Sequence, residues 1–310
     1  MISREGLEML RQLREADRAF GDPNRPFNLA GLKQNITVRA MPTSSDVKCL
    51  QLRIDDIPAE WVVAPGADPD LRLLYLHGGG FVSGSGGNYL AMAAHISAAA
   101  QCAILLPDYR LAPEHRFPAG LEDCVRAYEW MLTAGPFGPA PAKATFIAGD
   151  SAGGSLTLAT LLALRDRGRP MPLAGMPLSA STDLTLASES MLTEKDPICS
   201  ARAMPKFAEH YLGDTDPRNP LASPVFGDYT GIPPLLIQVG EHEMLRDDSV
   251  RVAAKARADG VNVTLEVWPG MVHVFQVREL PESLEAIQHM ADFMRACSKE
   301  SCKIANFAQL

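Results

Sequence analysis

The sequence predicts an α/β protein built on one mostly parallel sheet with helices on both faces. Two observations support this fold class. From residue 71 onward, short apolar runs typical of strands alternate with segments of helical period, and such alternation predicts parallel strands joined by right-handed crossovers. The chain of 310 residues is also long enough to bury a large core.

The segment before residue 71 has a different character. In residues 3–20 apolar side chains recur at three- and four-residue steps, which predicts an amphipathic helix, and the Gly- and Pro-containing segment 21–26 ends it. Strands are then predicted at 34–40, 47–54 and 61–64. Because these strands are closely spaced, we expect antiparallel hairpins at one edge of the sheet.

The alternating region follows, and it is interrupted once, at about 183–228, by a stretch rich in Pro, Asp and Met. The predicted strands are 71–76, 102–107, 145–148, 171–179, 234–239 and 261–267. The predicted helices are 89–100, 118–132, 152–167, 247–259 and 281–294.

The composition is that of an ordinary globular protein, with 46% hydrophobic and 21% charged residues. The net charge of −8 argues against nucleic acid or an anionic membrane as a partner. No apolar run approaches the roughly 18 residues of a membrane span, and no signal-peptide core follows the first residues. Six cysteines show no CxxC and no metal-ligand spacing, which predicts free thiols and a cytoplasmic location.

The motif with the most chemical content is GDSAG at 149–153. It follows an apolar strand and opens an apolar helix, which is the context of a nucleophile elbow. A serine that attacks a carbonyl must project from a sharp, strained turn, and Gly149 and Gly153 leave room for the strand and helix to approach. Ser151 is therefore the predicted nucleophile.

A second motif, HGGGF at 77–81, follows the strand 71–76. Consecutive glycines at a strand end expose backbone N–H groups that can hold a developing oxyanion. The order strand, HGGG, elbow is typical of lipases and esterases with the α/β-hydrolase fold. A phosphate-binding loop fits less well, because the segment lacks the P-loop lysine and the GxGxxG spacing.

The predicted general base is His273, in the loop after the last predicted strand. A base of this kind is oriented by a carboxylate, and in this fold the order along the chain is Ser, acid, His. The acid should therefore follow the strand 234–239, where the candidates are Glu241, Glu243 and Asp247.

Together these segments resemble the hormone-sensitive-lipase family, the bacterial family IV esterases, and within it the GDSAG branch. The resemblance extends from about residue 71 to about 293. It is carried by HGGGF at 77–81, PDYRLAPEHRFPA at 107–119, GDSAGG at 149–154 and GMVHVF at 270–275.

The resemblance implies an α/β-hydrolase fold with a helical cap. We expect residues 1–40 and 185–220 to form the cap, and 41–184 and 221–297 to form the catalytic domain. The tail 298–310 has no recognisable motif and is expected to be a frayed end.

The family typically carries its acid in the pattern D-P-L-x-D, and this chain departs from that pattern. Glu243 occupies the position of the first Asp and is the predicted acid. Asp247 is the alternative acid, although it and Asp248 fit better as charges at the start of the helix 247–259. Glu241 is a weaker alternative.

The resemblance also assigns supporting roles. The N–H groups of Gly79, Gly80 and Ala152 are expected to form the oxyanion hole, while His77 and Asp150 support the site without taking part in catalysis. Apolar residues of the oxyanion loop and cap are candidates for the substrate pocket: Phe81, Met191, Met204, Phe207, Tyr211 and Leu212.

We therefore expect a serine carboxylesterase that cleaves short to medium acyl esters through a Ser-His-Glu triad. No HExxH motif or cluster of His and Asp appears, so neither a metal nor another cofactor is expected. The expected partner is a small-molecule ester, and the chain could form a homodimer. The alternatives are a lactone hydrolase or amidase with the same triad, a lipase for long chains, and a non-catalytic binder on this fold.

Overall fold

The computed structural model describes residues 2–20, 45–194 and 196–307. In this part of the chain the central sheet has eight strands. Their order in space is β1 (Lys48–Ile54), β2 (Ile57–Val63), β4 (Cys102–Pro107), β3 (Asp68–Leu76), β7 (Ala144–Asp150), β8 (Gly175–Leu178), β9 (Leu235–His242) and β10 (Val263–Val272).

The sheet is mostly parallel, as the sequence predicts. β1 pairs with β2, and β2 with β4, in antiparallel fashion, while every neighbouring pair from β4 to β10 is parallel. The predicted antiparallel hairpin therefore forms one edge of the sheet. The strand predicted at 34–40 and the break at 21–26 lie outside the described residues.

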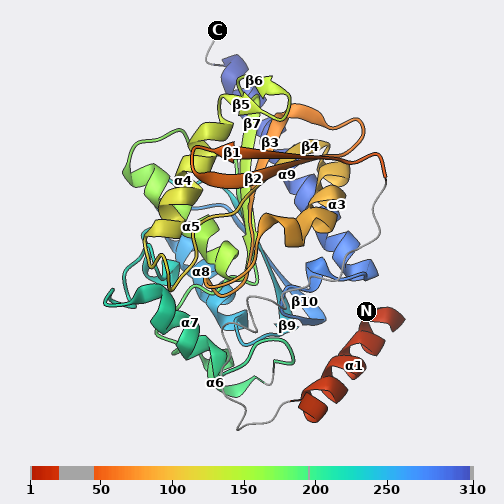
Figure 1. Cartoon of the computed structure of the whole chain (residues 1–310), viewed down its shortest axis with the longest axis vertical. Helices are drawn as coiled ribbons and strands as arrows, with labels where there is room; N and C mark the ends of the chain where they lie inside the picture. Colours follow the sequence, from red (N-terminus) through yellow and green to blue (C-terminus); the bar gives the residue numbers. More distant parts are fainter. Residues whose placement is uncertain (1, 21–44, 195, 308–310) are drawn as a thin grey trace.

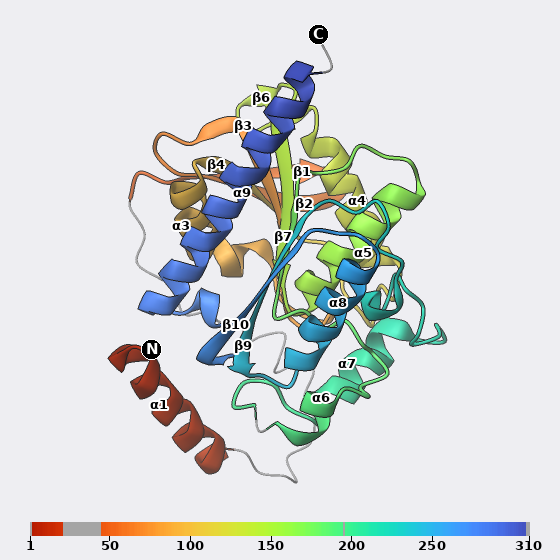
Figure 2. The same cartoon turned by 180° about the vertical axis from the view of Figure 1, so that it is seen from behind.

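Helices cover both faces of the sheet and bury two separate apolar cores. On one face α3 (Leu90–Ala100) and α9 (Pro281–Phe307) lie side by side (Figure 2). The other face carries α4 (Ala119–Met131), α5 (Ala152–Asp166) and α8 (Arg246–Ala258). All six residues of β4 are buried, as expected for a strand covered on both sides, whose sequence is a continuous apolar run.

The remaining helices gather at one end of the molecule. α6 (Glu189–Thr193) and α7 (Ala203–Leu212) lie near the carboxyl ends of the parallel strands, and α1 (Arg4–Phe20) lies at the same end (Figure 1). Met9 of α1 and Ile2, just before the helix, pack against a cluster from β10, η3 and the start of α9. Short 3₁₀ turns occur at η1 (Gly86–Tyr89), η2 (Pro224–Phe226) and η3 (Phe275–Val277), and β5 (Ala134–Gly135) and β6 (Gly138–Pro139) form a small ribbon.

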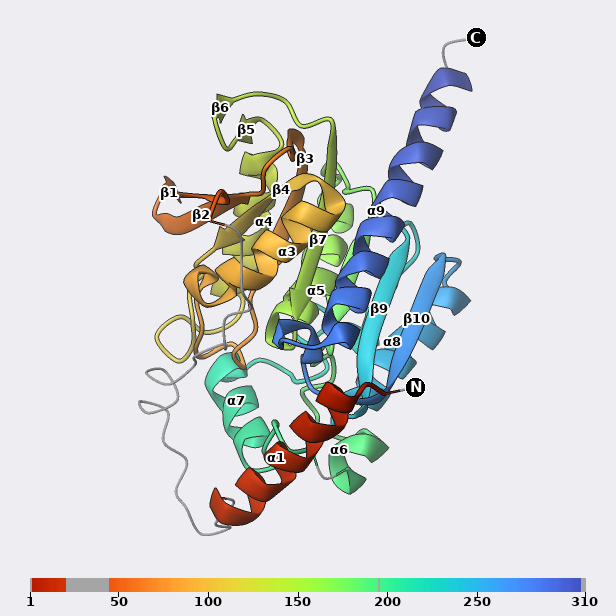
Figure 3. The ribbon, with the colours of Figure 1, turned by 90° about the vertical axis from the view of Figure 1, so that its right-hand side faces the viewer.

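Two elements continue five or more residues beyond their predicted ends. The last strand is predicted to end at 267, before Pro269 and Gly270, yet β10 continues to Val272 with a register shift after Trp268. β10 is an edge strand, where a proline needs no partner in the ladder. α9 continues to Phe307, through most of the predicted frayed tail (Figure 3), because no Gly or Pro follows Pro281 to stop it.

Candidate active site

Ser151 lies at the turn between β7 and α5. Its backbone has φ 53° and ψ −119°, a strained conformation for a residue other than glycine. A Cβ on Gly149 would lie 2.5 Å from the Leu76 carbonyl oxygen, and a Cβ on Gly153 would collide with the same oxygen. Both glycines are therefore required by the close approach of β3 to the turn.

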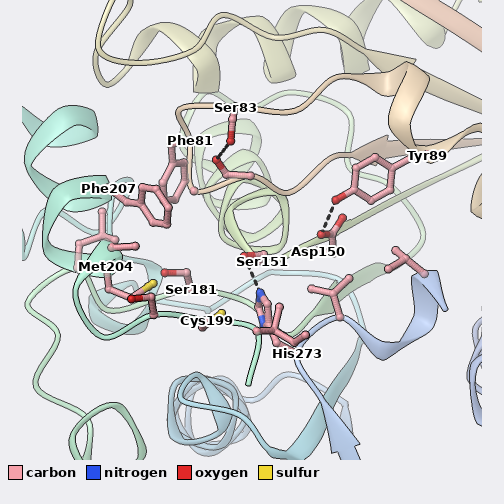
Figure 4. Close-up of a pocket in the computed structure, with 18 of the residues that line it drawn as sticks. Phe81, Ser83, Tyr89, Asp150, Ser151, Ser181, Cys199, Met204, Phe207 and His273 are labelled. Carbon is pink, nitrogen blue, oxygen red and sulfur yellow. Dashed lines mark hydrogen bonds between the residues drawn. The ribbon is translucent and has the colours of Figure 1, made fainter. Parts of the chain in front are cut away.

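Ser151 is the first member of a chain of hydrogen bonds (Figure 4). The Ser151 Oγ lies 3.0 Å from His273 Nε2, and His273 Nδ1 lies 2.9 Å from Glu243 Oε2. The three side chains follow β7, β9 and β10, whose parallel arrangement brings their carboxyl ends together. Nδ1 carries the proton donated to Glu243, so Nε2 is free to accept the serine proton.

Glu243 is fully buried and its second oxygen is also occupied. Oε1 accepts hydrogen bonds from the Ser179 hydroxyl at 2.7 Å and the Gly240 N–H at 2.5 Å. Burial of the His273 ring works against its protonation, but Cys199 and Glu243 outweigh that effect and raise the His273 pKa well above its usual value. This environment favours the imidazolium that forms when His273 accepts a proton.

The alternative acids lie elsewhere. Asp247 is in the first turn of α8, where its carboxylate accepts the Ser190 N–H at 2.8 Å and contacts Arg246. It joins α8 to α6 rather than capping its own helix, since Leu245 is the N-cap and makes no side-chain capping bond. Glu241 Oε2 accepts the Gly270 N–H at 2.8 Å.

The loop after β3 brings Gly79 and Gly80 to the site, where both line the cavity beside Ser151. They have φ values of 124° and 62°. Neither N–H group donates a hydrogen bond to another of the described residues. Ala152 follows Ser151 as the first residue of α5, so its N–H is one of the donors that a helix start leaves open.

His77 supports this loop partly through its ring and partly through its backbone. Its Nδ1–H donates to the Gly78 carbonyl at 2.8 Å, and the ring stacks on Tyr109 at 4.2 Å. The Tyr109 hydroxyl donates to the His77 carbonyl at 2.6 Å. Burial lowers the His77 pKa, so the ring is neutral and positions the loop rather than carrying charge.

Asp150 is buried beside Ser151 and accepts three hydrogen bonds. The Tyr75 hydroxyl donates at 2.9 Å, the Tyr89 hydroxyl at 2.8 Å and the Gly78 N–H at 3.1 Å. Burial raises the Asp150 pKa to about 6, although these hydrogen bonds act in the opposite direction. The carboxyl group thus ties the turn at Ser151 to the loop after β3.

The site opens into a cavity of about 450 Å³, a size typical of small-molecule sites. Its floor is formed by the loops that follow β3, β7, β8 and β10. Residues 198–207, between α6 and α7 and in the first part of α7, form the opposite wall (Figure 4). Of the predicted pocket residues, Phe81, Met204 and Phe207 line it.

The other predicted pocket residues do not line the cavity. Tyr211 lies behind Phe81, with the two rings stacked at 3.9 Å, and it contacts Phe117 on another side. Met191 packs with Met244 and Leu245, and Leu212 joins the core on the α5 face. Apolar composition alone did not distinguish residues that face the cavity from those that pack behind it.

Several site residues were not predicted. Ser179 ends the predicted strand 171–179, which was the only sequence signal for its position. Arg278 lines the cavity, and its Nε has no hydrogen-bond partner among the described residues. Cys199 also lines the cavity and, with Asp196 and His273, forms a group whose atoms could bind a metal ion.

A fold with an open parallel sheet and a serine elbow at its centre is that of the α/β hydrolases, and comparison with known proteins agrees. The family model described as the alpha/beta hydrolase fold matches residues 73–277. The chain belongs to this family, and it is a hydrolase that acts on ester bonds.

Relatives of known name support this assignment. An acetyl-hydrolase of Streptomyces hygroscopicus is 42% identical over 249 residues, which cover 79% of this chain and 82% of the relative. An esterase of Acinetobacter venetianus is 33% identical, with 82% and 84% covered. In the described part of this chain no helix is long and apolar enough to cross a membrane.

Solved structures extend the similarity to nearly the whole chain. The crystal structure of EstE5 soaked with p-nitrophenyl butyrate has a TM-score of 0.88 and 41% identity, covering 96% of this chain and 99% of EstE5. An esterase from the bacterial hormone-sensitive lipase family has a TM-score of 0.85 and 39% identity, with 96% and 100% covered. The resemblance predicted from the motifs is thereby confirmed.

Proposed function

We propose that this protein hydrolyses short to medium acyl carboxylic esters through a triad of Ser151, His273 and Glu243. The observation that carries the proposal is the unbroken chain of hydrogen bonds from Ser151 Oγ through His273 to Glu243. A serine is a weak nucleophile until a base accepts its proton, and this geometry provides the base and its orienting carboxylate.

In the proposed reaction His273 Nε2 accepts the Ser151 proton while Oγ attacks the ester carbonyl. The N–H groups of Gly79, Gly80 and Ala152 hold the resulting oxyanion. His273 then donates its proton to the leaving alcohol, and the acyl group stays on Ser151. A water molecule, deprotonated by His273, attacks the acyl-enzyme and releases the carboxylic acid.

The preference for short acyl groups is inferred from the shape of the site. The ring of Phe207, on α7, lies so close to Gly80 that a Cβ there would be 2.8 Å from it. The α6–α7 segment therefore closes over the oxyanion loop and limits the space for an acyl chain. We propose that this segment belongs to a cap, as expected for 185–220; part of the other cap region, 1–40, lies outside the described residues.

The test is a hydrolysis profile over p-nitrophenyl esters of increasing acyl length, run with lactones and emulsified long-chain triglyceride. We expect kcat/KM to be highest for acyl groups of about four to eight carbons, which a cavity of about 450 Å³ accommodates. A preference for the emulsified triglyceride would contradict the proposal, and a preference for lactones would favour the lactone-hydrolase alternative.

A further inference from the structure

The catalytic histidine shares its pocket with two potential metal ligands from the α6–α7 segment. One ligand atom from each of Asp196, Cys199 and His273 lies within 4.8 Å of the other two. Cys199 and His273 both line the substrate cavity (Figure 4). We propose that these three residues form an inhibitory binding site for Zn²⁺ and similar divalent ions.

The donor set suits a borderline-soft ion. Thiolate sulfur, imidazole nitrogen and carboxylate oxygen are the ligands of tetrahedral zinc sites, whereas Mg²⁺ and Ca²⁺ prefer oxygen alone. Usual bond lengths place tetrahedral ligand atoms about 3.5 Å apart. Side-chain movements of about 1 Å would therefore bring the three atoms to one ion. As the ion binds, the thiol releases its proton to solvent and sulfur bonds to the metal.

The ligands are held in place before any ion binds. The Asp196 carboxylate accepts the N–H groups of Ile198 and Cys199 at 2.8 and 3.0 Å, and that of Met244 at 3.1 Å. On the other side, Glu243 accepts the His273 Nδ1–H, so a metal would bind Nε2 in place of the hydrogen bond to Ser151. A carboxylate behind a ligating histidine is the usual outer-shell arrangement at zinc.

Binding at this site would block the reaction directly. A metal on Nε2 occupies the lone pair that accepts the Ser151 proton, since Ser151 Oγ lies 3.0 Å from that same nitrogen. The ion would also join the α6–α7 segment to the loop after β10 across the cavity. The loss of activity rests on the role proposed for His273, whereas metal binding itself does not.

The first test measures inhibition. Enzyme freed of metal by EDTA dialysis should lose activity toward a short p-nitrophenyl ester in micromolar Zn²⁺, regain it with EDTA, and be insensitive to the same concentration of Mg²⁺. Activity is expressed relative to each variant's own metal-free rate. On this scale, Cys199→Ser should raise the half-inhibiting Zn²⁺ concentration at least about tenfold. Asp196→Asn should act in the same direction. The matched control is Cys49→Ser, an exposed thiol on the opposite edge strand β1, which should leave both the activity and the inhibition unchanged.

The second test detects binding without activity. Cd²⁺ should produce a thiolate charge-transfer absorbance that saturates at one ion per chain in the wild type, in Cys49→Ser and in the inactive Ser151→Ala. The absorbance should disappear in Cys199→Ser. Any one of three outcomes would overturn the site. These are absence of Zn²⁺ inhibition in the wild type, equal inhibition of Cys199→Ser and Cys49→Ser, and an absorbance that survives Cys199→Ser. Because Ser151→Ala is inactive, Cd²⁺ binding to this variant tests the metal site independently of the proposed triad.

Discussion

Ser151 combines a strained backbone with a hydrogen bond to the predicted base, and its side chain contributes no apolar area to the core. Ser151→Ala should therefore fold normally and lose nearly all esterase activity. The check is kcat/KM for a short acyl ester, together with the thermal unfolding temperature. A variant that keeps more than about a hundredth of the activity would exclude Ser151 as the nucleophile, given the size of triad effects.

Glu243 offers a sharper test at the residue scale. In Glu243→Gln, the amide oxygen can still accept from Ser179 and Gly240, but the NH₂ group then faces His273 Nδ1. Two donors cannot share that contact, so the ring is driven to the wrong tautomer. We expect kcat to fall by about 10²- to 10⁴-fold.

The matched control for this change is Asp247→Asn. Asp247 contacts Ser190 and Arg246, so its kcat should stay within about threefold of the wild type, as expected for a residue that binds neither substrate nor base. If Asp247→Asn were the more damaging of the two, the assignment of the acid would have to be reversed.

At the scale of elements, α8 is tied to the loop after β8 by a buried acid. Asp248 Oδ2 accepts the N–H groups of Thr182 and Asp183 at 2.9 and 3.0 Å. Burial raises the Asp248 pKa to about 7, and although the backbone hydrogen bonds lower it, the nearby Asp183 raises it further. Asp183 is itself paired with Arg251 at 2.6 Å.

This raised pKa makes a prediction about stability. The folded protein holds the Asp248 proton up to about pH 7, whereas the unfolded chain releases it near pH 4, so this group lowers stability as pH rises through that window. The free energy of unfolding in urea should fall between pH 5 and pH 8. In Asp248→Asn, which cannot ionise, the fall should be smaller by about 2 kcal/mol. An identical pH dependence in the two proteins would show that Asp248 is ionised throughout.

At the scale of the whole molecule, the proposed reaction uses only groups of the chain itself. Exhaustive dialysis against EDTA should therefore leave full activity, and it should raise the activity of a preparation that carries zinc. The measurement is the specific activity before and after dialysis, with metal content determined on the same samples. Activity lost on dialysis and restored by one particular divalent ion would contradict the cofactor-free mechanism.

Local patterns were enough to predict most of the fold. The alternation of apolar strands and helices, the glycine-bounded elbow and the antiparallel edge are all encoded within short windows, because backbone geometry and burial impose them locally. One error arose where context overrides a local signal, since Pro269 is tolerated because β10 is an edge strand. The end of α9 is different, because the absence of Gly and Pro after Pro281 is itself a local signal that the helix continues.

The sequence by itself determined the fold class, the family and the residue types of a serine hydrolase site, since these depend on spacing and on motifs. The motif register already favoured Glu243 as the acid. The tertiary structure places it, rather than Asp247 or Glu241, against the His273 ring, because the three carboxylates lie within seven residues and differ chiefly in the direction of their side chains. Only the tertiary structure decided the positions of Tyr211, which packs behind Phe81, and of Cys199, which reaches His273 from a segment over 70 residues away in sequence. Such placements depend on packing between distant segments, and no local pattern records them.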